Sequence, residues 1–199
     1  MDDQMNSQDL RERVALIEDM IAEGRRSTES WGWVFVLWGI AYYVAIAGGG
    51  MLRTPIAWPV TMISACVLTG ILVSRRGHNR TNTTIGRAIG AIWISAGISM
   101  FLVFLSLGTS GRIDLHIMVA VLGAMLGCAN AASALILKWK MQFACAVVWW
   151  GCAIFACFGR STPVTIAFLT AIFFCQIFFG IYGMVMDSRR RRQRGVAHA

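Results

Sequence analysis

Two side-chain amides are the strongest polar groups placed deep in this chain. Asn130 and Gln176 each lie inside a long run of apolar residues. In hydrocarbon, an amide can hydrogen-bond to a neighbouring helix or to a bound solute. Trp149 lies in a third apolar run and could face the same interior. These residues predict either a polar link between helices or the lining of a path for a small neutral or apolar solute.

Enzymatic chemistry has few candidate residues. No Asp, Glu, Lys or Arg lies in the middle of an apolar run, although proton relays and ion-coupled transporters normally need such groups there. Asp114 and His116 combine an acid and a base, but their place at the start of a run favours helix capping and solvation. We therefore expect a non-enzymatic protein without catalytic residues.

The cysteines and histidines lack the spacing of a metal or redox site. The chain has no Cys-x-x-Cys pair and no cluster of histidines or carboxylates that would suit zinc or haem. All six cysteines lie in apolar runs, where a small packing role is typical: Cys66, Cys128, Cys145, Cys152, Cys157 and Cys175. We expect no metal and no cofactor.

The apolar runs themselves are long enough to cross a membrane. Of the 199 residues, 57% are hydrophobic and 14% are charged, which is too few charges for a soluble domain. A helix needs about 20 apolar residues to cross about 30 Å of hydrocarbon. The sequence predicts an all-α polytopic membrane protein with an N-terminal segment at 1–30, a transmembrane domain at 31–186 and a basic tail at 187–199. The six spans, joined as three hairpins, are expected at 31–50, 55–73, 88–107, 115–137, 142–158 and 163–186.

The basic residues indicate how these spans are oriented. The net charge is +8, and with both termini in the cytoplasm, all 18 Lys and Arg residues except Arg53, Arg112 and Arg160 lie on the cytoplasmic side. Since Lys and Arg accumulate in cytoplasmic loops, this distribution predicts a cytoplasmic N-terminus and C-terminus. The arginines at 189–194 are then expected to anchor the last span at the lipid bilayer, and no nucleic acid is expected as a partner.

Small residues predict how the spans pack. Gly123 and Gly127 form a small-xxx-small step that allows another helix to approach closely, so the span at 115–137 is expected to be the central packing helix or an oligomer face. A tryptophan followed by small residues recurs in three spans: Trp38, Trp93 and Trp150. The recurrence fits a repeat of three hairpins, and it also fits the ordinary composition of membrane helices.

The segment before the first span contains an amphipathic pattern. Four apolar residues recur at spacings of four, three and four: Leu10, Val14, Ile17 and Ile21. They form an apolar stripe on a helix expected at about 7–23, with Gly24 ending it. The rest of this helix is net negative, which disfavours binding to an anionic lipid surface. We expect the stripe to pack on its own bundle, on a second copy in a homo-oligomer, or on a cytoplasmic or membrane protein partner.

The order of features at the start of the chain also carries a resemblance. An acidic helix and the pair Arg25-Arg26 precede the motif Gly32-Trp33-x-Phe35-x-Leu37-Trp38-Gly39. This order resembles a loose group of uncharacterised small multi-pass bacterial membrane proteins, in which an N-terminal amphipathic helix precedes a G-W-x-F-x-L-W-G first transmembrane helix. The resemblance implies a place in the bacterial inner (plasma) membrane and carries no catalytic residue over.

Overall fold

The chain folds almost entirely into helices. In the computed structural model, the described residues are 2–52, 57–76, 84–112 and 114–197. An N-terminal helix, α1 (Asp2–Glu29), precedes the first span. The elements that follow are α2 (Gly32–Leu52), α3 (Ala57–Arg76), α4 (Thr84–Thr109), α5 (Leu115–Leu137), α6 (Lys140–Phe158), α7 (Ser161–Ile172), the π-helix η2 (Phe173–Phe178) and α8 (Phe179–Ala197).

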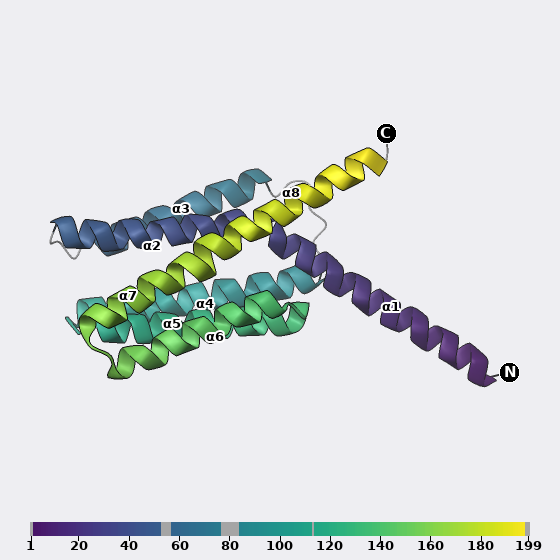
Figure 1. The fold of residues 1–199 in the computed structure, drawn as a ribbon, viewed down its shortest axis with the longest axis horizontal. Helices are drawn as coiled ribbons and strands as arrows, with labels where there is room; N and C mark the ends of the chain where they lie inside the picture. The colour runs from purple at the N-terminus through teal and green to yellow at the C-terminus, as the bar shows by residue number, and fades with distance from the viewer. Residues whose placement is uncertain (1, 53–56, 77–83, 113, 198–199) are drawn as a thin grey trace.

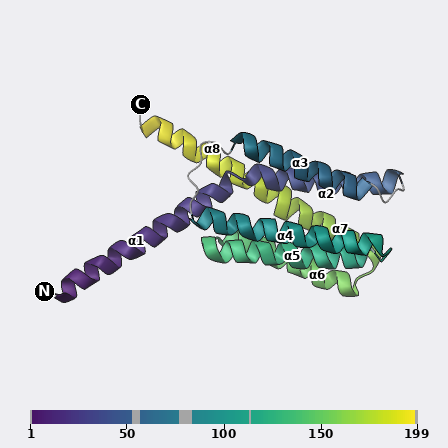
Figure 2. The same ribbon diagram turned by 180° about the vertical axis from the view of Figure 1, so that it is seen from behind.

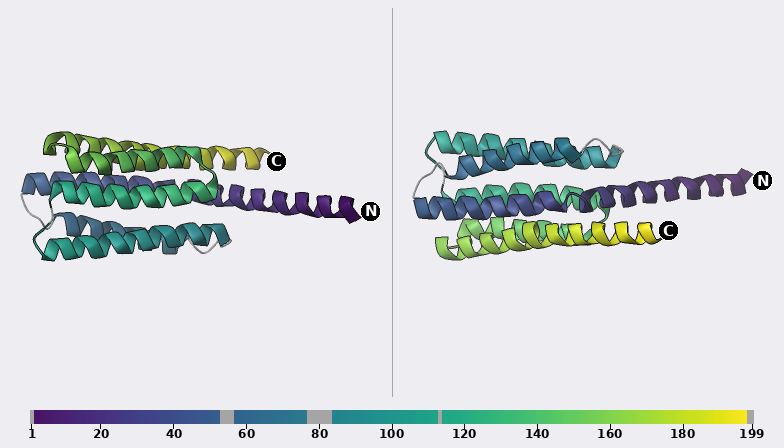
Figure 3. Two further views of the ribbon diagram at one scale, coloured as in Figure 1. Left: turned by 90° about the horizontal axis from the view of Figure 1, so that it is seen from below. Right: turned by 90° about the horizontal axis from the view of Figure 1, so that it is seen from above.

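Six helical segments are long and apolar enough to cross a membrane. Five of them are α2 to α6, and the sixth is the continuous helix formed by α7, η2 and most of α8. The spans run side by side, and α1 and the last turns of α8 leave the bundle at the same end (Figures 1 and 3). The predicted all-α polytopic fold with six spans is confirmed, and the chain is a multi-pass membrane protein.

The most buried span is α5, which packs along α6 in an antiparallel hairpin and also contacts α4 and α7. A Cβ added to Gly123 would lie 2.8 Å from the carbonyl oxygen of Trp149 and 3.0 Å from the Cβ of Ala153. A Cβ added to Gly127 would overlap the indole ring of Trp150. Both glycines therefore lie on the α5–α6 contact, where the absence of side chains lets the two helices approach closely.

A second glycine contact joins α2 to α8. A Cβ added to Gly180 would lie 2.6 Å from the carbonyl oxygen of Gly32 and 2.7 Å from the Cγ2 of Val36. The first span is thereby held against the last, because neither backbone carries a side chain where they meet. In contrast, α3 packs mainly against α2 and exposes most of its surface (Figure 2).

Both ends of the chain are more helical than the sequence predicts. The first helix covers Asp2–Glu29, so the prediction that it ends at Gly24 is wrong, and no linker separates it from the turn before α2. The helix continues through Gly24 because this residue lies against the bundle, where a Cβ would be 2.5 Å from the Cγ2 of Ile85 and 3.0 Å from the Cδ2 of Leu137. Residues 187–197, which belong to the predicted basic tail, are helical and continue α8.

The last span contains a π-helix that no glycine or proline marks in the sequence. The buried residues of this span come in adjacent pairs around the π-helix, and each pair follows the previous one by four residues: Ala171 with Ile172, Cys175 with Gln176, and Phe179 with Gly180. In an α-helix, two residues that are four positions apart differ by about 40° in their direction around the axis. A π-helix has more residues per turn, so residues at this spacing stay closer to one face. The π-helix thus keeps Cys175 and Gln176 on the inner face.

Candidate functional site

Most of the apolar stripe on α1 is exposed. Leu10, Val14 and Ile17 expose 56%, 53% and 55% of their surfaces, and Ile21 is half-buried. The C-terminal turns of α1 contact α4, α5 and α8, while its N-terminal part projects beyond the bundle (Figure 1). The hypothesis that the stripe packs on its own bundle is therefore wrong for its first three residues.

The C-terminal turns of α1 are fixed to the end of α5 by Arg25. Its Nη2 donates hydrogen bonds to the carbonyl oxygens of Leu137, at 3.0 Å, and Lys138, at 2.9 Å. Lys138 closes α5 in the left-handed conformation, with φ of 49°. A guanidinium is stabilising at this position because the C-terminus of a helix carries partial negative charge. The α1 anchor is the set of residues that holds this end of the helix: Gly24, Arg25 and Glu29.

Glu29 joins the α1 anchor to α8. Only 3% of Glu29 is exposed, its Oε1 lies 3.2 Å from the Nη2 of Arg190, and its Oε2 has no hydrogen-bond partner within the described residues. Burial raises the pKa of Glu29 above its ordinary value of 4.5, although the positive charges of Arg190 and Arg25 act in the opposite direction. The contact between α1 and α8 therefore contains a carboxyl group whose charge is disfavoured.

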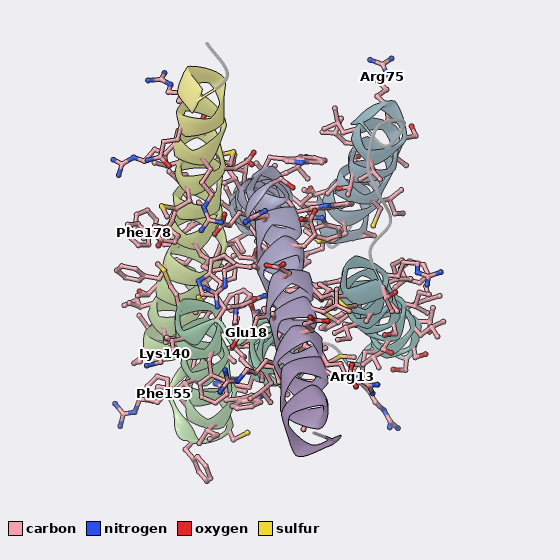
Figure 4. All side chains as sticks on the ribbon, turned by 90° about the vertical axis from the view of Figure 1, so that its right-hand side faces the viewer. Arg13, Glu18, Arg75, Lys140, Phe155 and Phe178 are labelled. Atoms are coloured by element: carbon pink, nitrogen blue, oxygen red, sulfur yellow. The ribbon has the colours of Figure 1, made fainter. Side chains whose placement is uncertain are left out.

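The charged residues of α1 are distributed unevenly around its axis. At 100° per residue, four carboxylates lie on the sides turned away from the stripe: Asp9, Glu12, Asp19 and Glu23. Arg13 and Glu18 instead lie on opposite flanks of α1, as Figure 4 shows. Arg13 also forms an ion pair of 2.9 Å with Asp9. The stripe is thus bordered by Arg13 on one side and by Glu18, with Arg11 beside it, on the other.

Three polar residues are completely buried in the α5–α6 hairpin: Asn130, Ser133 and Gln142. The Nδ2 of Asn130 donates to the carbonyl oxygen of Leu126 in its own helix, at 2.8 Å, so this donor does not form the predicted link to another helix. The Oδ1 of Asn130, the Oγ of Ser133 and both amide atoms of Gln142 have no partner in the part of the chain that is described. Unpaired buried polar atoms are costly, so a hydrogen bond from a water molecule or a polar solute would stabilise these atoms.

Trp149 lies on α6 of the same hairpin, and Gln176 lies on η2, which contacts α6. Trp149 is fully buried in α6, and its Nε1 lacks a partner among the described residues. Gln176 lies in η2 close to α2, since a Cβ added to Gly39 would be 3.0 Å from the Cβ of Gln176. Beside it, the thiol of Cys175 donates to the carbonyl oxygen of Cys145, at 3.7 Å, which connects η2 to α6.

The sequence-based candidates do not include Ser133 or Gln142. Gln142 lies in the first turn of α6, where a polar residue is ordinary at a membrane interface. Helical spacing is the signal that identifies it, because Gln142, Cys145 and Trp149 follow one another at steps of three and four on one face. Ser133 can be found in the same way, three residues after Asn130 on α5.

No metal site accompanies these groups in the described ranges, where no three His, Cys, Asp or Glu side chains lie close enough to hold a metal ion. No family model, curated protein or solved structure matches the chain. The functional argument therefore depends on two features of the molecule itself. One is the exposed stripe on an anchored helix, and the other is the set of open polar atoms inside the α5–α6 hairpin.

Proposed function

We propose that this protein is a non-enzymatic interaction or regulatory module of the membrane, in which the six spans hold α1 at the surface for protein binding. The observation that carries the proposal is the exposure of Leu10, Val14 and Ile17 on a helix whose other end is fixed by the α1 anchor. A rigidly held helix with an open apolar face can bind a partner with little further ordering.

The proposed location is the bacterial inner membrane, with α1 and the end of α8 in the cytoplasm. The excess of Lys and Arg at the end of the bundle where these helices leave supports this orientation. The resemblance of the first 40 residues to small multi-pass bacterial membrane proteins supports the location. The acidic residues of α1 support a protein partner, because an anionic lipid surface would repel them.

A matched pair of substitutions tests the proposal. Ile17→Glu places a charge in the centre of the stripe, whereas Leu16→Glu introduces the same side chain at a neighbouring residue that is 62% exposed and lies off the stripe. In native membranes treated with a cross-linker, we expect Ile17→Glu to lower recovery of the cross-linked complex about fivefold or more, since a central apolar contact contributes on the order of 1 kcal/mol or more. Leu16→Glu should retain the complex.

Deletion of residues 1–24 provides the decisive comparison. The proposal requires that this deletion remove the cross-linked complex while the six spans remain inserted in the membrane. If every cross-linked species and the oligomeric state are the same with and without residues 1–24, α1 has no role in association and the proposal is wrong.

The open polar atoms of Asn130 and Gln142 favour a second candidate, a carrier or channel for a small neutral or apolar solute. Such a path needs polar groups in the interior to replace the hydration of the solute. Asn130→Leu and Gln176→Leu should then reduce uptake of the solute by cells that express the protein. Full uptake by both variants would exclude this function.

A further inference from the structure

We propose that the stripe of α1 binds the stripe of a second copy of this chain. The two helices would form a short parallel coiled coil in which Arg13 of each copy pairs with Glu18 of the other. This inference rests on the proposed function, because it names the partner of the same surface. It is carried by the exposure of the stripe and by the charges that border it.

The stripe has the spacing of a coiled-coil seam. With Val14 and Ile21 at a positions, Leu10 and Ile17 occupy the d positions of the same heptads. The β-branched residues at both a positions, together with Leu10 at d, are typical of parallel two-stranded coiled coils, and Ile17 is the d position that departs from this pattern. The next d position is Gly24, which belongs to the α1 anchor and lies against Ile85 of its own bundle. The seam therefore ends where α1 joins the bundle.

The flanking charges are complementary between two parallel copies. Arg13 occupies a g position and Glu18 the following e position, which are the positions that face each other across a parallel coiled coil. Two-fold symmetry gives this pair twice in each dimer. Within one chain, these two side chains lie about 140° apart around the helix, so they cannot pair with each other.

The remaining carboxylates are placed where a second copy does not meet them. Glu12 and Asp19 occupy f positions, and Asp9 and Glu23 occupy c positions, all on the outside of the pair. The net negative charge of α1 therefore does not oppose dimer formation at the seam. The flanks of the stripe are not uniformly acidic, because Arg13 lies on one side and Arg11 lies beside Glu18 on the other, and this arrangement does not favour a uniformly basic partner.

The membrane supplies the parallel orientation. Two copies inserted in the same direction present α1 on the same side of the bilayer, with the N-terminal parts both pointing away from it (Figure 3). A seam of about 12 residues is too short to be stable between free helices. Two-dimensional confinement raises the effective concentration of one helix near another, which favours a short seam.

Charge reversal in the full-length chain tests the pairing. Two populations that carry donor and acceptor fluorophores at the N-terminus are co-expressed, and energy transfer is measured in native membranes. Arg13→Glu or Glu18→Arg replaces two attractive pairs with two repulsive ones, so each variant alone should lower the apparent association constant roughly fivefold. Glu12→Arg and Asp19→Arg are matched controls on the outer face and should leave energy transfer unchanged.

Restoration is the diagnostic result. A chain with both Arg13→Glu and Glu18→Arg should recover energy transfer, and so should a mixture of one donor chain carrying Arg13→Glu with one acceptor chain carrying Glu18→Arg. Arg13→Glu removes the ion pair with Asp9 both as a single change and in the double variant, so loss of that ion pair cannot produce the recovery. Energy transfer that the single reversals leave unchanged, or that neither combination restores, overturns the coiled-coil pairing.

The same variants separate this inference from the proposed function. If charge reversal has no effect on energy transfer but Ile17→Glu still removes a cross-linked complex with another protein, α1 binds a different partner and only the pairing of two copies is wrong. If Ile17→Glu changes neither energy transfer nor any cross-linked complex, the proposed function fails together with the inference.

Discussion

The carboxyl group of Glu29 is buried. Its charged neighbours are Arg190, Arg25, Arg26 and Asp187. Its raised pKa means that the folded protein binds the proton more tightly than the unfolded chain does. The stability that this proton contributes is fully present below the ordinary pKa of 4.5 and is lost as the pH rises through the raised value. Acidification should therefore stabilise the folded protein relative to the unfolded chain.

We expect Glu29→Gln to flatten this pH dependence. The amide keeps the shape of the side chain and cannot ionise, so the variant should lose less stability than the wild type as the pH rises above 4.5. The measurement is the thermal unfolding midpoint of the purified protein in detergent at a series of pH values. Glu23→Gln is the control, because Glu23 is exposed and its ion pair with Arg26 is long, at 3.8 Å. Equal pH profiles for wild type and Glu29→Gln would contradict the expectation.

At the scale of the elements, the contacts between helices depend on where side chains are absent. Gly180→Ala would push α8 away from the carbonyl oxygen of Gly32, and we expect a loss of about 1–3 kcal/mol of stability. Gly90→Ala is the matched change in α4, where a Cβ would meet nothing within 4 Å, and it should stabilise the helix by about 0.5–1 kcal/mol. Unfolding midpoints in detergent should therefore shift in opposite directions, and a shift in the same direction would count against the α2–α8 contact.

The spans could be predicted because hydrocarbon leaves few solutions for a long apolar run. Span 115–137 matches α5 at both ends, and the other predicted ends that fall in the described residues lie within a few residues of the ends of the apolar segments that could cross a membrane. The π-helix could not be predicted, because no residue that breaks helices marks it and the inward packing of Cys175 and Gln176 depends on contacts with other spans. The continuation of α1 through Gly24 depends in the same way on a contact with Ile85, which is 61 positions away in the sequence.

The candidate sites could be predicted only in part. The spacing of Leu10, Val14 and Ile17 identified the stripe, but whether it meets its own bundle depends on the direction in which α1 leaves, which the anchor at Arg25 and Glu29 determines. The anchor was not apparent, because its partners Leu137 and Arg190 are far along the chain. Gln142 could not be recognised as a buried residue from its type alone, because polar residues near the end of a span are also common at membrane interfaces.

For the whole molecule, the distribution of charge gives a prediction about topology. Single cysteines introduced at two exposed positions test this topology. Ser110→Cys places a thiol at one end of the bundle, and Gln193→Cys places one on α8 at the other end. If α1 and the end of α8 are cytoplasmic, a membrane-impermeant thiol reagent should label Ser110→Cys in intact spheroplasts and Gln193→Cys only after the membrane is opened. The reverse pattern would place α1 on the outer side. The wild-type chain, whose cysteines all lie in the spans, is the control for background labelling.

The contact of α2 with α8 has a consequence for how the protein is completed during synthesis. The first hairpin enters the bilayer long before the ribosome has made the last span, so α2 must reside among lipids with α3 as its main neighbour. Glu29 also has no Arg190 to pair with until almost the entire chain has been translated. A nascent chain that stops early would thus expose Gly32 and Val36 of α2 to lipid where α8 later packs, and would leave the carboxyl group of Glu29 without Arg190.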